Sequence, residues 1–182
     1  MTTYIVLLRG INVGGKNKVP MRELKQHLEE LGFQDVMTYI QSGNVILKSR
    51  LGAQIITNKI EAMLPAKFKL DSSIIKILTL TAGQLQAIVD NKPKGFGDQP
   101  DLYYSDAVFL MGIDADTAME VFDPKEGVDR VWKGEGVIYS ERLGALRTKS
   151  RLNKIVGTPA YKSMTIRSWN TTIKLLGIIK DL

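Results

Sequence analysis

The sequence contains no cysteine and only one histidine among its 182 residues. The absence of cysteine excludes disulfides, thiolate zinc sites and cysteine nucleophiles. His27 lies between Leu24 and Leu28 on a predicted helix, so we interpret it as a partly buried structural residue. With no second histidine for a metal pair, we expect no metal site. A Ser-His-Asp triad would have to recruit the helix-bound His27, and nothing marks a cofactor, so we expect neither. A Ser–Lys dyad using Ser42 or Ser150 stays open, and no catalytic residue is identified.

Long hydrophobic runs are also missing, although 44% of the residues are hydrophobic. No stretch approaches the roughly 20 apolar residues that a membrane span needs, so we expect no membrane partner. The apolar segment Met1–Leu8 is short, ends at Arg9 and Gly10, and has no basic region before it. It predicts a strand and not a signal peptide, which favours a cytoplasmic location. The hydrophobic share suffices for one domain or two small ones.

Acidic residues are absent from a long C-terminal stretch, Arg142–Lys180, although the preceding segment from Gly95 to Glu141 is rich in them. The net charge is +6 and the sequence pI is about 9.4. A field of one sign attracts phosphates, nucleic acids, acidic metabolites or the acidic segment of the same chain, and we give the last alternative equal weight. The stretch carries nine cations: Arg142, Arg147, Lys149, Arg151, Lys154, Lys162, Arg167, Lys174 and Lys180.

The first half of the chain predicts an α+β fold. Apolar periodicity indicates four strands and two helices, in which Pro20 begins the first helix, Gly32 ends it, and Pro65 stops the second. The order βαββαβ is that of the ferredoxin-like, or split-βαβ, pattern. The predicted elements are strand 4–8, helix 21–31, strands 36–40 and 45–47, helix 53–64, and strand 74–80.

A connecting helix and a second, smaller α+β part are predicted beyond residue 80. Thr81 and Gln84 form a capping box for a helix over 82–90. We therefore assign residues 1–90 to a ferredoxin-like domain with this helix, 91–104 to a linker, and 105–182 to a second subdomain. The order βαββα there suggests a diverged repeat, although no residue-level repeat is visible. Its predicted elements are strand 107–112, helix 114–121, strands 130–132 and 137–140, and helices 148–156 and 168–180.

The loop after the first strand, Arg9–Asn17, is rich in glycine. Gly10, Gly15 and Lys16 match most of the phosphate-loop pattern of nucleoside triphosphatases. Asn17 replaces the hydroxyl residue that would hold magnesium, and Pro20 lacks an N–H that the following helix would need. A looser anion-binding loop is therefore favoured. The alternative is a connection in which glycine serves only to allow positive φ.

The second motif is the predicted hairpin turn at residues 41–44, which alone is an ordinary turn. In a βαββαβ sheet the first and second strands run parallel. The exit loop of the first strand and this hairpin therefore share one end of the sheet. We expect two groups of polar residues to meet there: Arg9, Asn12 and Lys16 from the loop, and Gln41, Ser42 and Asn44 from the hairpin.

The third motif lies around the start of the last helix. Ser168 is a fair N-cap, and Trp169, Ile173 and Leu176 share one face. Two neutral polar groups between two cations suit phosphate or carboxylate binding, whereas the alternative is a solvated helix face. The polar residues, at i, i+3, i+4 and i+7 on the opposite face, are Arg167, Asn170, Thr171 and Lys174.

These motifs together resemble a known family. RGINVGG, MxxLxxxLxxLGF, TYIQSGN and TxRxWNTxxKL are similar to the mostly bacterial domain-of-unknown-function family numbered 1697. The resemblance spans nearly the whole chain. It implies a two-part α+β fold with a ferredoxin-like first part, and it implies no activity. Ser168 stands where the family has asparagine, so no role of that asparagine carries over. The family's polar motif positions correspond to Arg9, Asn12, Gln41, Ser42, Asn44, Arg167, Asn170, Thr171 and Lys174.

The sequence thus favours an anionic, phosphorylated small molecule as ligand, with turnover and oligomeric state left open. One alternative is a nucleic-acid-binding module that uses the basic C-terminal third. Another is a protein-interaction domain for an acidic partner. The three motifs are predicted to build one ligand-binding site, whose residues are Arg9, Asn12, Lys16, Gln41, Ser42, Asn44, Arg167, Asn170, Thr171 and Lys174.

Overall fold

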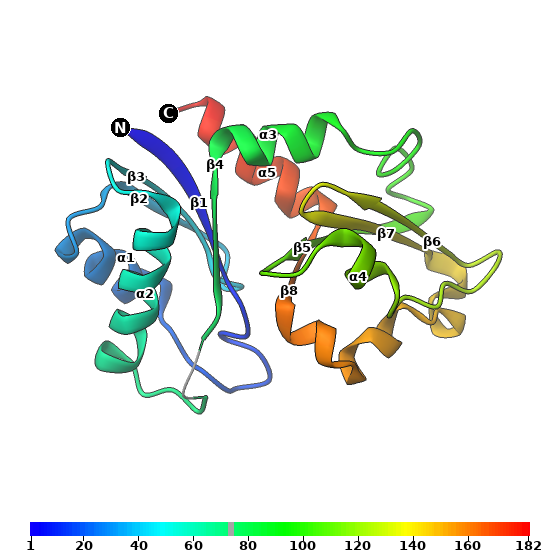
Figure 1. Cartoon of the computed structure of the whole chain (residues 1–182), viewed down its shortest axis with the longest axis horizontal. Coiled ribbons are helices and arrows are strands. Elements are labelled where there is room, and N and C mark those ends of the chain that lie inside the picture. Colours follow the sequence, from blue (N-terminus) through cyan, green and yellow to red (C-terminus); the bar gives the residue numbers. More distant parts are fainter. Residues whose placement is uncertain (73–74) are drawn as a thin grey trace. The chain divides into compact units, whose positions relative to one another are not determined.

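The computed structural model describes residues 1–72 and 75–182 of the chain (Figure 1). The fold is α+β, as predicted, with two four-stranded antiparallel sheets. The chain divides into two compact units. The first unit comprises Met1–Leu85 together with Leu175–Leu182, and the second comprises Gln86–Lys174. The predicted linker, residues 91–104, lies inside the second unit.

The first unit has the βαββαβ order that the sequence predicts. Its strands lie in the order β2-β3-β1-β4, and every neighbouring pair is antiparallel, which agrees with the ferredoxin-like pattern. β1 is buried from Tyr4 to Leu8, as expected of a central strand. The elements are β1 (Thr2–Leu8), α1 (Met21–Glu30), β2 (Gln34–Tyr39), β3 (Asn44–Ser49), α2 (Ala53–Lys67) and β4 (Ile77–Thr81).

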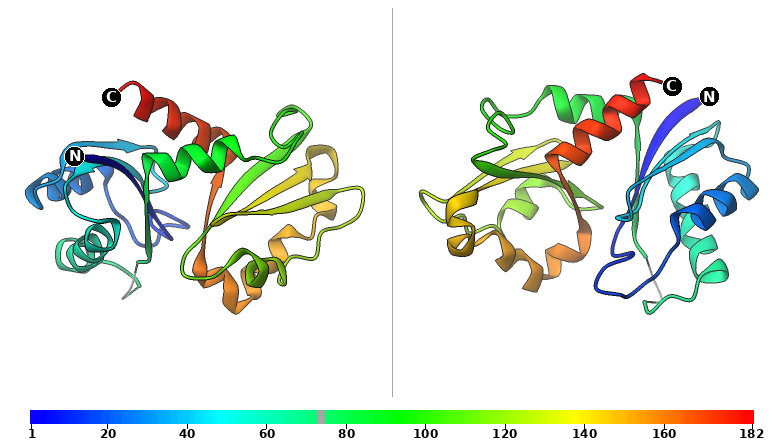
Figure 2. Two further views of the ribbon diagram at one scale, coloured as in Figure 1. Left: turned by 45° about the horizontal axis from the view of Figure 1, so that its top comes forward. Right: turned by 180° about the vertical axis from the view of Figure 1, so that it is seen from behind.

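Helices α1 and α2 cover one face of this sheet with an apolar core (Figure 2). The alternate residues Tyr4, Val6 and Leu8 of β1 point into that core, as the two-residue period of a strand requires. From the helices, Leu24 and Ile60 are fully buried against them. Burial of this apolar face, and not helix propensity, is what stabilises the two helices.

Two predicted boundaries in the first unit differ from the structure. Pro65 does not stop α2, which continues to Lys67. A proline in the last helical turn removes only one hydrogen bond, and Phe68 N–H still reaches the carbonyl of Leu64 at 2.9 Å. The predicted strand 74–80 begins at a position outside the described residues, and the described strand β4 runs from Ile77 to Thr81.

The second unit has the strand order β6-β7-β5-β8, again antiparallel throughout. Strand β8 was not predicted. The predicted helix over 148–156 is wrong, because three short 3₁₀ helices occupy residues 144–163, where Gly157 and Pro159 interrupt any longer helix. The elements are β5 (Tyr103–Leu110), α4 (Ala115–Met119), β6 (Asp129–Gly134), β7 (Val137–Leu143), η1 (Gly144–Lys149), η2 (Leu152–Gly157), η3 (Pro159–Ser163) and β8 (Met164–Ser168).

A helix follows the last strand of each sheet: α3 (Ala82–Asp90) follows β4, and α5 (Trp169–Lys180) follows β8. The predicted capping box of α3 is confirmed. Thr81 N–H donates to Gln84 Oε1 at 2.8 Å, and Gln84 N–H donates to Thr81 Oγ1 at 3.1 Å. Ser168 caps α5 as predicted, because its hydroxyl accepts the Thr171 N–H at 3.2 Å.

Candidate functional site

The glycine-rich loop after β1 folds back on itself as a small turn. Gly14 and Gly15 have φ of 58° and 77°, and Val13 pairs with Lys16 across them. Helix α1 begins only at Met21, and the sheet is antiparallel. The phosphate-loop interpretation is therefore wrong, because that loop leads from a strand directly into the helix that follows its lysine.

Asn12 ties this loop to the hairpin. Its Nδ2 donates to the carbonyls of Val19 and Gln41, each at 2.9 Å, and its Oδ1 accepts the Val19 N–H at 2.8 Å. The expected proximity of the two motifs is confirmed. The Asn12 amide is engaged with backbone groups, so its observed role is to hold the loop in place.

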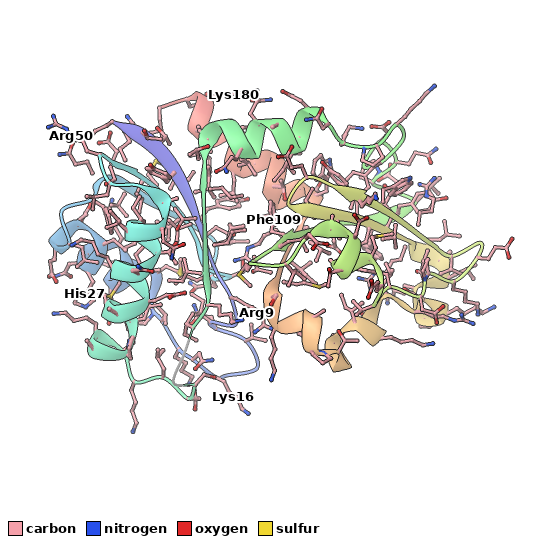
Figure 3. All side chains as sticks on the ribbon, in the orientation of Figure 1. Arg9, Lys16, His27, Arg50, Phe109 and Lys180 are labelled. Carbon is pink, nitrogen blue, oxygen red and sulfur yellow. The ribbon has the colours of Figure 1, made fainter. Side chains whose placement is uncertain are left out.

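Asn44 and Gly43 stabilise the hairpin in the same way. Asn44 is fully buried, and its Nδ2 donates to Tyr39 O and Ser42 Oγ, each at 3.0 Å. A Cβ at Gly43 would approach Ile11 and Leu8 within 2.9 Å, so the hairpin packs closely on the loop. Lys16 remains exposed on its turn, whereas Arg9 is half-buried (Figure 3).

The C-terminal motif is arranged differently from the prediction. Arg167 does not lie on the helix; it belongs to β8, is only 7% exposed, and donates from Nη1 to Thr165 Oγ1 at 3.0 Å and Ile166 O at 2.9 Å. Burial lowers the pKa of Arg167 to about 10. Asn170 and Lys174 are exposed. Because the motifs belong to different units, their union in one site stays a prediction.

Part of the basic stretch pairs with the acidic segment that precedes it. Arg142 Nη2 lies 3.3 Å from Asp106 Oδ2. Arg151 and Lys154 share Asp123, at 3.3 and 3.0 Å. The acidic segment of the chain is thus one of the anions that the positive field attracts, which was one of the alternatives that the sequence left open.

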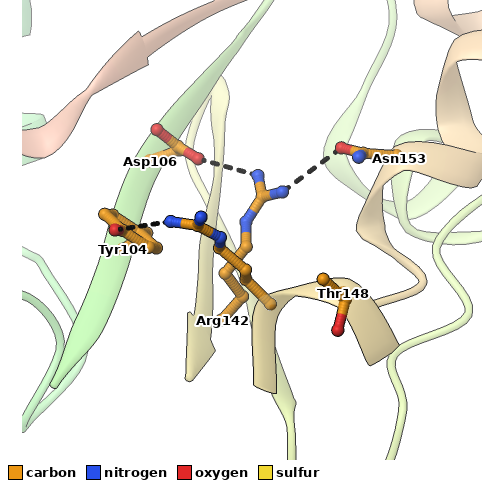
Figure 4. Close-up of a pocket in the computed structure, with 6 residues that line it drawn as sticks. Tyr104, Asp106, Arg142, Thr148 and Asn153 are labelled. Carbon is orange, nitrogen blue, oxygen red and sulfur yellow. Dashed lines mark hydrogen bonds and ion pairs between the residues drawn. The ribbon is translucent and has the colours of Figure 1, made fainter. Parts of the chain in front are cut away.

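A polar pocket of about 410 Å³ lies within the second unit, over the face of its sheet (Figure 4). Two arginines reach it from neighbouring elements, Arg142 from β7 and Arg147 from η1. Its volume lies within the range of about 300–1,000 Å³ that is typical of small-molecule sites. The lining residues are Tyr104, Asp106, Arg142, Arg147, Thr148 and Asn153.

Polar contacts hold both guanidinium groups in this pocket. Arg142 donates to Asp106 Oδ2 and to Asn153 Oδ1, each at 3.3 Å. Arg147 Nη1 donates to Tyr104 Oη at 3.3 Å (Figure 4). Within the described part of the chain no carboxylate pairs with Arg147, so its charge is available to a ligand.

Arg142 Nε is buried and has no hydrogen-bond partner among the described residues, and the same is true of Asp129 Oδ1. Asp129 and Arg142 are cross-strand partners on β6 and β7. Desolvation raises the pKa of Asp106, and the nearby Arg142 opposes the shift only in part. A polar cleft that contains a carboxyl group with a raised pKa is a candidate functional site.

Sequence reasoning missed this pocket. Arg142 and Arg147 were recognised only as members of a basic stretch, and Asp106 only as a member of an acidic one. Asp106 faces Ser140 in the β5–β7 register, which places it beside Arg142. That register depends on a strand pairing that no local motif encodes. The available signal was the carboxylate of Asp106 directly before the apolar run of the predicted strand 107–112, because a charge beside a buried strand requires a partner.

No group of three metal-ligating side chains occurs among residues 1–72 and 75–182. Over the same ranges, no helix combines the length and apolar character needed to cross a membrane.

Proteins similar to this chain include a ribosomal protein and a bacterial protein of solved structure. The small ribosomal subunit protein uS3 of Mycoplasma pneumoniae is 27% identical over 138 residues, which is 72% of this chain but only 50% of that protein. This chain therefore spans about half the length of that relative. The solved structure of the conserved bacterial protein SP0830 from Streptococcus pneumoniae is 30% identical, has a TM-score of 0.82, and is covered over 97% of both chains.

The family model named "Protein of unknown function (DUF1697)" matches residues 1–139. This range contains the glycine-rich loop and the hairpin, and the motif at the start of α5 lies beyond it. The resemblance inferred from the motifs is confirmed, and the chain belongs to the DUF1697 family.

Proposed function

We propose that this protein binds an anionic, phosphorylated small molecule, and that the pocket between Arg142 and Arg147 is the binding site. The observation that carries this proposal is the convergence of two guanidinium groups on a pocket of about 410 Å³ with one carboxylate. Asp106 offsets one positive charge, so the pocket keeps an excess of one. This location differs from the first-strand end that the sequence favours.

Phosphate suits these groups better than other anions do. Arginine offers a planar fork of donors that matches phosphate oxygens in a bidentate manner. Thr148 and Asn153 add a hydroxyl and an amide at the same pocket. Whether the ligand is also turned over is left open.

The test is a thermal-shift and calorimetric titration with inorganic phosphate and ribose 5-phosphate. A ligand that binds only the folded state raises the melting temperature in step with RT ln(1 + [L]/Kd). In Arg147→Ala we expect an affinity loss of about 10- to 100-fold, typical of a charge-assisted hydrogen bond. If neither compound binds, or if Arg147→Ala binds like the wild type, the proposal is wrong.

Two further variants distinguish this pocket from cations elsewhere on the chain. Arg22→Ala removes an exposed arginine from α1 in the other unit, and should leave binding unchanged. Lys174→Ala removes an exposed cation of the motif that the sequence favours. A loss of binding in Lys174→Ala alone would locate the ligand at that motif and would contradict the proposed pocket.

Nucleic-acid binding is a second candidate, favoured by the similarity to a ribosomal protein. The affinity for a mixed oligonucleotide should then fall steeply with salt, because cations that contact phosphates release counterions. Lys149→Glu discriminates between the candidates, since Lys149 lies in the basic stretch but does not line the pocket. It should weaken oligonucleotide binding and spare ribose 5-phosphate binding. No oligonucleotide binding at low salt would dispose of this candidate.

We propose that this protein functions in the bacterial cytoplasm. The absence of cysteine is compatible with a reducing compartment, where disulfides are rare. SP0830, a similar protein of known structure, is a conserved bacterial protein. Fractionation of cells that express the tagged chain would test this location.

A further inference from the structure

A second, smaller cavity adjoins the pocket inside the same unit. Its volume is about 180 Å³, and it shares Tyr104 and Asp106 with the larger pocket. It exists because β8 ends at Ser168, opposite Asp106, whereas β5 begins three residues earlier, at Tyr103. The space where β8 would continue is left between the start of β5 and the start of α5.

The walls of this cavity combine aromatic side chains with polar ones, although Trp169 itself is only 5% exposed. Tyr103, Tyr104 and Trp169 line it, and the Arg130 guanidinium stacks on the Tyr103 ring at 4.1 Å, which fixes that ring. Trp169 is held by Phe96 and Tyr139, whose ring centroids lie 4.9 and 6.1 Å away. The cavity is therefore preorganised for a flat group.

Asn170 supplies the polar edge. Its side chain lines the cavity and is exposed, and its amide has no hydrogen-bond partner within the described chain. An asparagine amide both donates and accepts, as the edge of a nucleobase does. A cavity of 180 Å³ is smaller than the roughly 300 Å³ at which sites for whole small ligands begin, so it suits one ring system.

We propose that the ligand of the pocket is a nucleotide, whose phosphate binds Arg142 and Arg147 and whose base enters the adjacent cavity beside Asn170. This inference rests on the proposed function, because the phosphate site is the same. Tyr104 forms the shared wall: its hydroxyl accepts from Arg147, and its ring borders the base cavity. Aromatic walls bind bases by stacking, which tolerates different bases.

The test uses a Trp132→Phe background, which leaves Trp169 as the only tryptophan of the two in the chain. Adenosine 5′-monophosphate, uridine 5′-monophosphate, ribose 5-phosphate and inorganic phosphate are titrated against it by calorimetry and fluorescence. At least one nucleotide should bind about tenfold more tightly than ribose 5-phosphate, as base stacking predicts. Only nucleotides should change the Trp169 emission.

Asn170→Ala should bring the nucleotide affinity down toward that of ribose 5-phosphate and leave the latter unchanged. Asn58→Ala, at an exposed position on α2, is the matched control and should change neither. If nucleotides and ribose 5-phosphate bind equally and the emission is unaffected, the inference is wrong and the proposed function stands. If no phosphate compound binds, both fail. If nucleotide binding is unchanged in Arg147→Ala, the smaller cavity would still bind the base. The proposal that the phosphate binds at Arg147 would then be wrong.

Discussion

The two units share a strand order but differ in what covers the corresponding sheet face. In each unit the first, third and fourth strands pair in the same antiparallel way, so β5 corresponds to β1 and β7 to β3. In the first unit α1 and the 15-residue α2 cover the face. In the second unit the short helix α4 and three 3₁₀ segments take their place.

The residues on the covered face follow this difference. From its two central strands the first unit presents Tyr4 paired to Leu47, and Val6 paired to Val45. The second presents Asp106 paired to Ser140. A long amphipathic helix seals a face continuously, whereas short 3₁₀ segments leave space between them. The space allows polar groups to remain partly hydrated, which is how the second unit can hold a pocket.

The largest effect on stability is expected in the first unit, where α1 and α2 cover the sheet. Ile60→Ala on α2 should destabilise the protein by about 2–5 kcal/mol, because Ile60 is fully buried and the helix cannot collapse onto the void. Ile55→Ala on the same helix, at a position that is 50% exposed, should change the free energy by no more than about 0.5 kcal/mol. Chemical denaturation measures both.

Ile155→Ala in η2 should cost less than Ile60→Ala, although Ile155 is only 4% exposed. The 3₁₀ segments can settle into the neighbouring space, and the cost of a cavity depends on how far the site collapses. An equal cost at both positions would show that the 3₁₀ segments of the second unit are as rigid as the helices of the first. The proposed difference between the two units would then be wrong.

The next effect concerns a close backbone approach in the second unit. A Cβ at Gly97 would lie 2.5 Å from the Trp169 indole, and its φ is +73°. Gly97→Ala should cost about 2–5 kcal/mol, the sum of about 1–2 for the left-handed backbone and about 1–3 for overpacking. Gly95→Ala, in the same loop with φ of +87° and open space around it, should show only the backbone cost. Similar melting temperatures for the two variants would exclude the clash.

Local patterns predicted the first unit well because its elements have clear signals. The apolar period of α1, the flanking Pro20 and Gly32, and the Thr81–Gln84 capping box all act within a few residues of sequence. The second unit was harder to predict because short helical segments, and not long amphipathic helices, cover its sheet. Its cover has no 3.6-residue apolar stripe, and in its five-residue strand β8 only every other residue beyond the start is buried.

The candidate site could be predicted only in part. The meeting of the loop and hairpin followed from topology, and the structure gives the Asn12–Gln41 contact as its basis. Asn12 and Asn44 looked like ligand residues because polar side chains in turns are ambiguous between binding and internal hydrogen bonding. The Arg142–Asp106 pair joins residues 36 positions apart, so only the sheet register could reveal it.

A smaller effect on stability is expected at the N-caps of α3 and α5, which occupy equivalent positions in the two units. Thr81 ends β4 and directly precedes α3, and Ser168 ends β8 and directly precedes α5. Thr81→Ala and Ser168→Ala should each cost about 1 kcal/mol, typical of a lost N-cap. Exchanging the two hydroxyl residues, Thr81→Ser and Ser168→Thr, should preserve most of the stability. If one alanine variant is neutral by denaturant titration, that cap does not correspond to its counterpart.

The smallest effect is expected at Asp106, where Arg142 offsets part of the desolvation that raises the carboxyl pKa. The sign follows from the order of ionisation. Above the ordinary pKa of 3.8, the unfolded chain ionises first while the folded carboxyl is still protonated, so the wild type loses stability as the pH rises. Above the raised pKa the loss is complete, and the curve becomes level.

Asp106→Asn has no such ionisation. The unfolding free energy of the wild type minus that of Asp106→Asn should therefore fall as the pH rises from 3.8 and then stay constant. Asp101→Asn, at an exposed position, controls for the loss of one negative charge. A difference that rises with pH would mean that Arg142 stabilises the carboxylate more than burial opposes it. The ion pair of Arg142 and Asp106 would then stabilise the fold, and Arg147 would still carry the excess positive charge of the pocket.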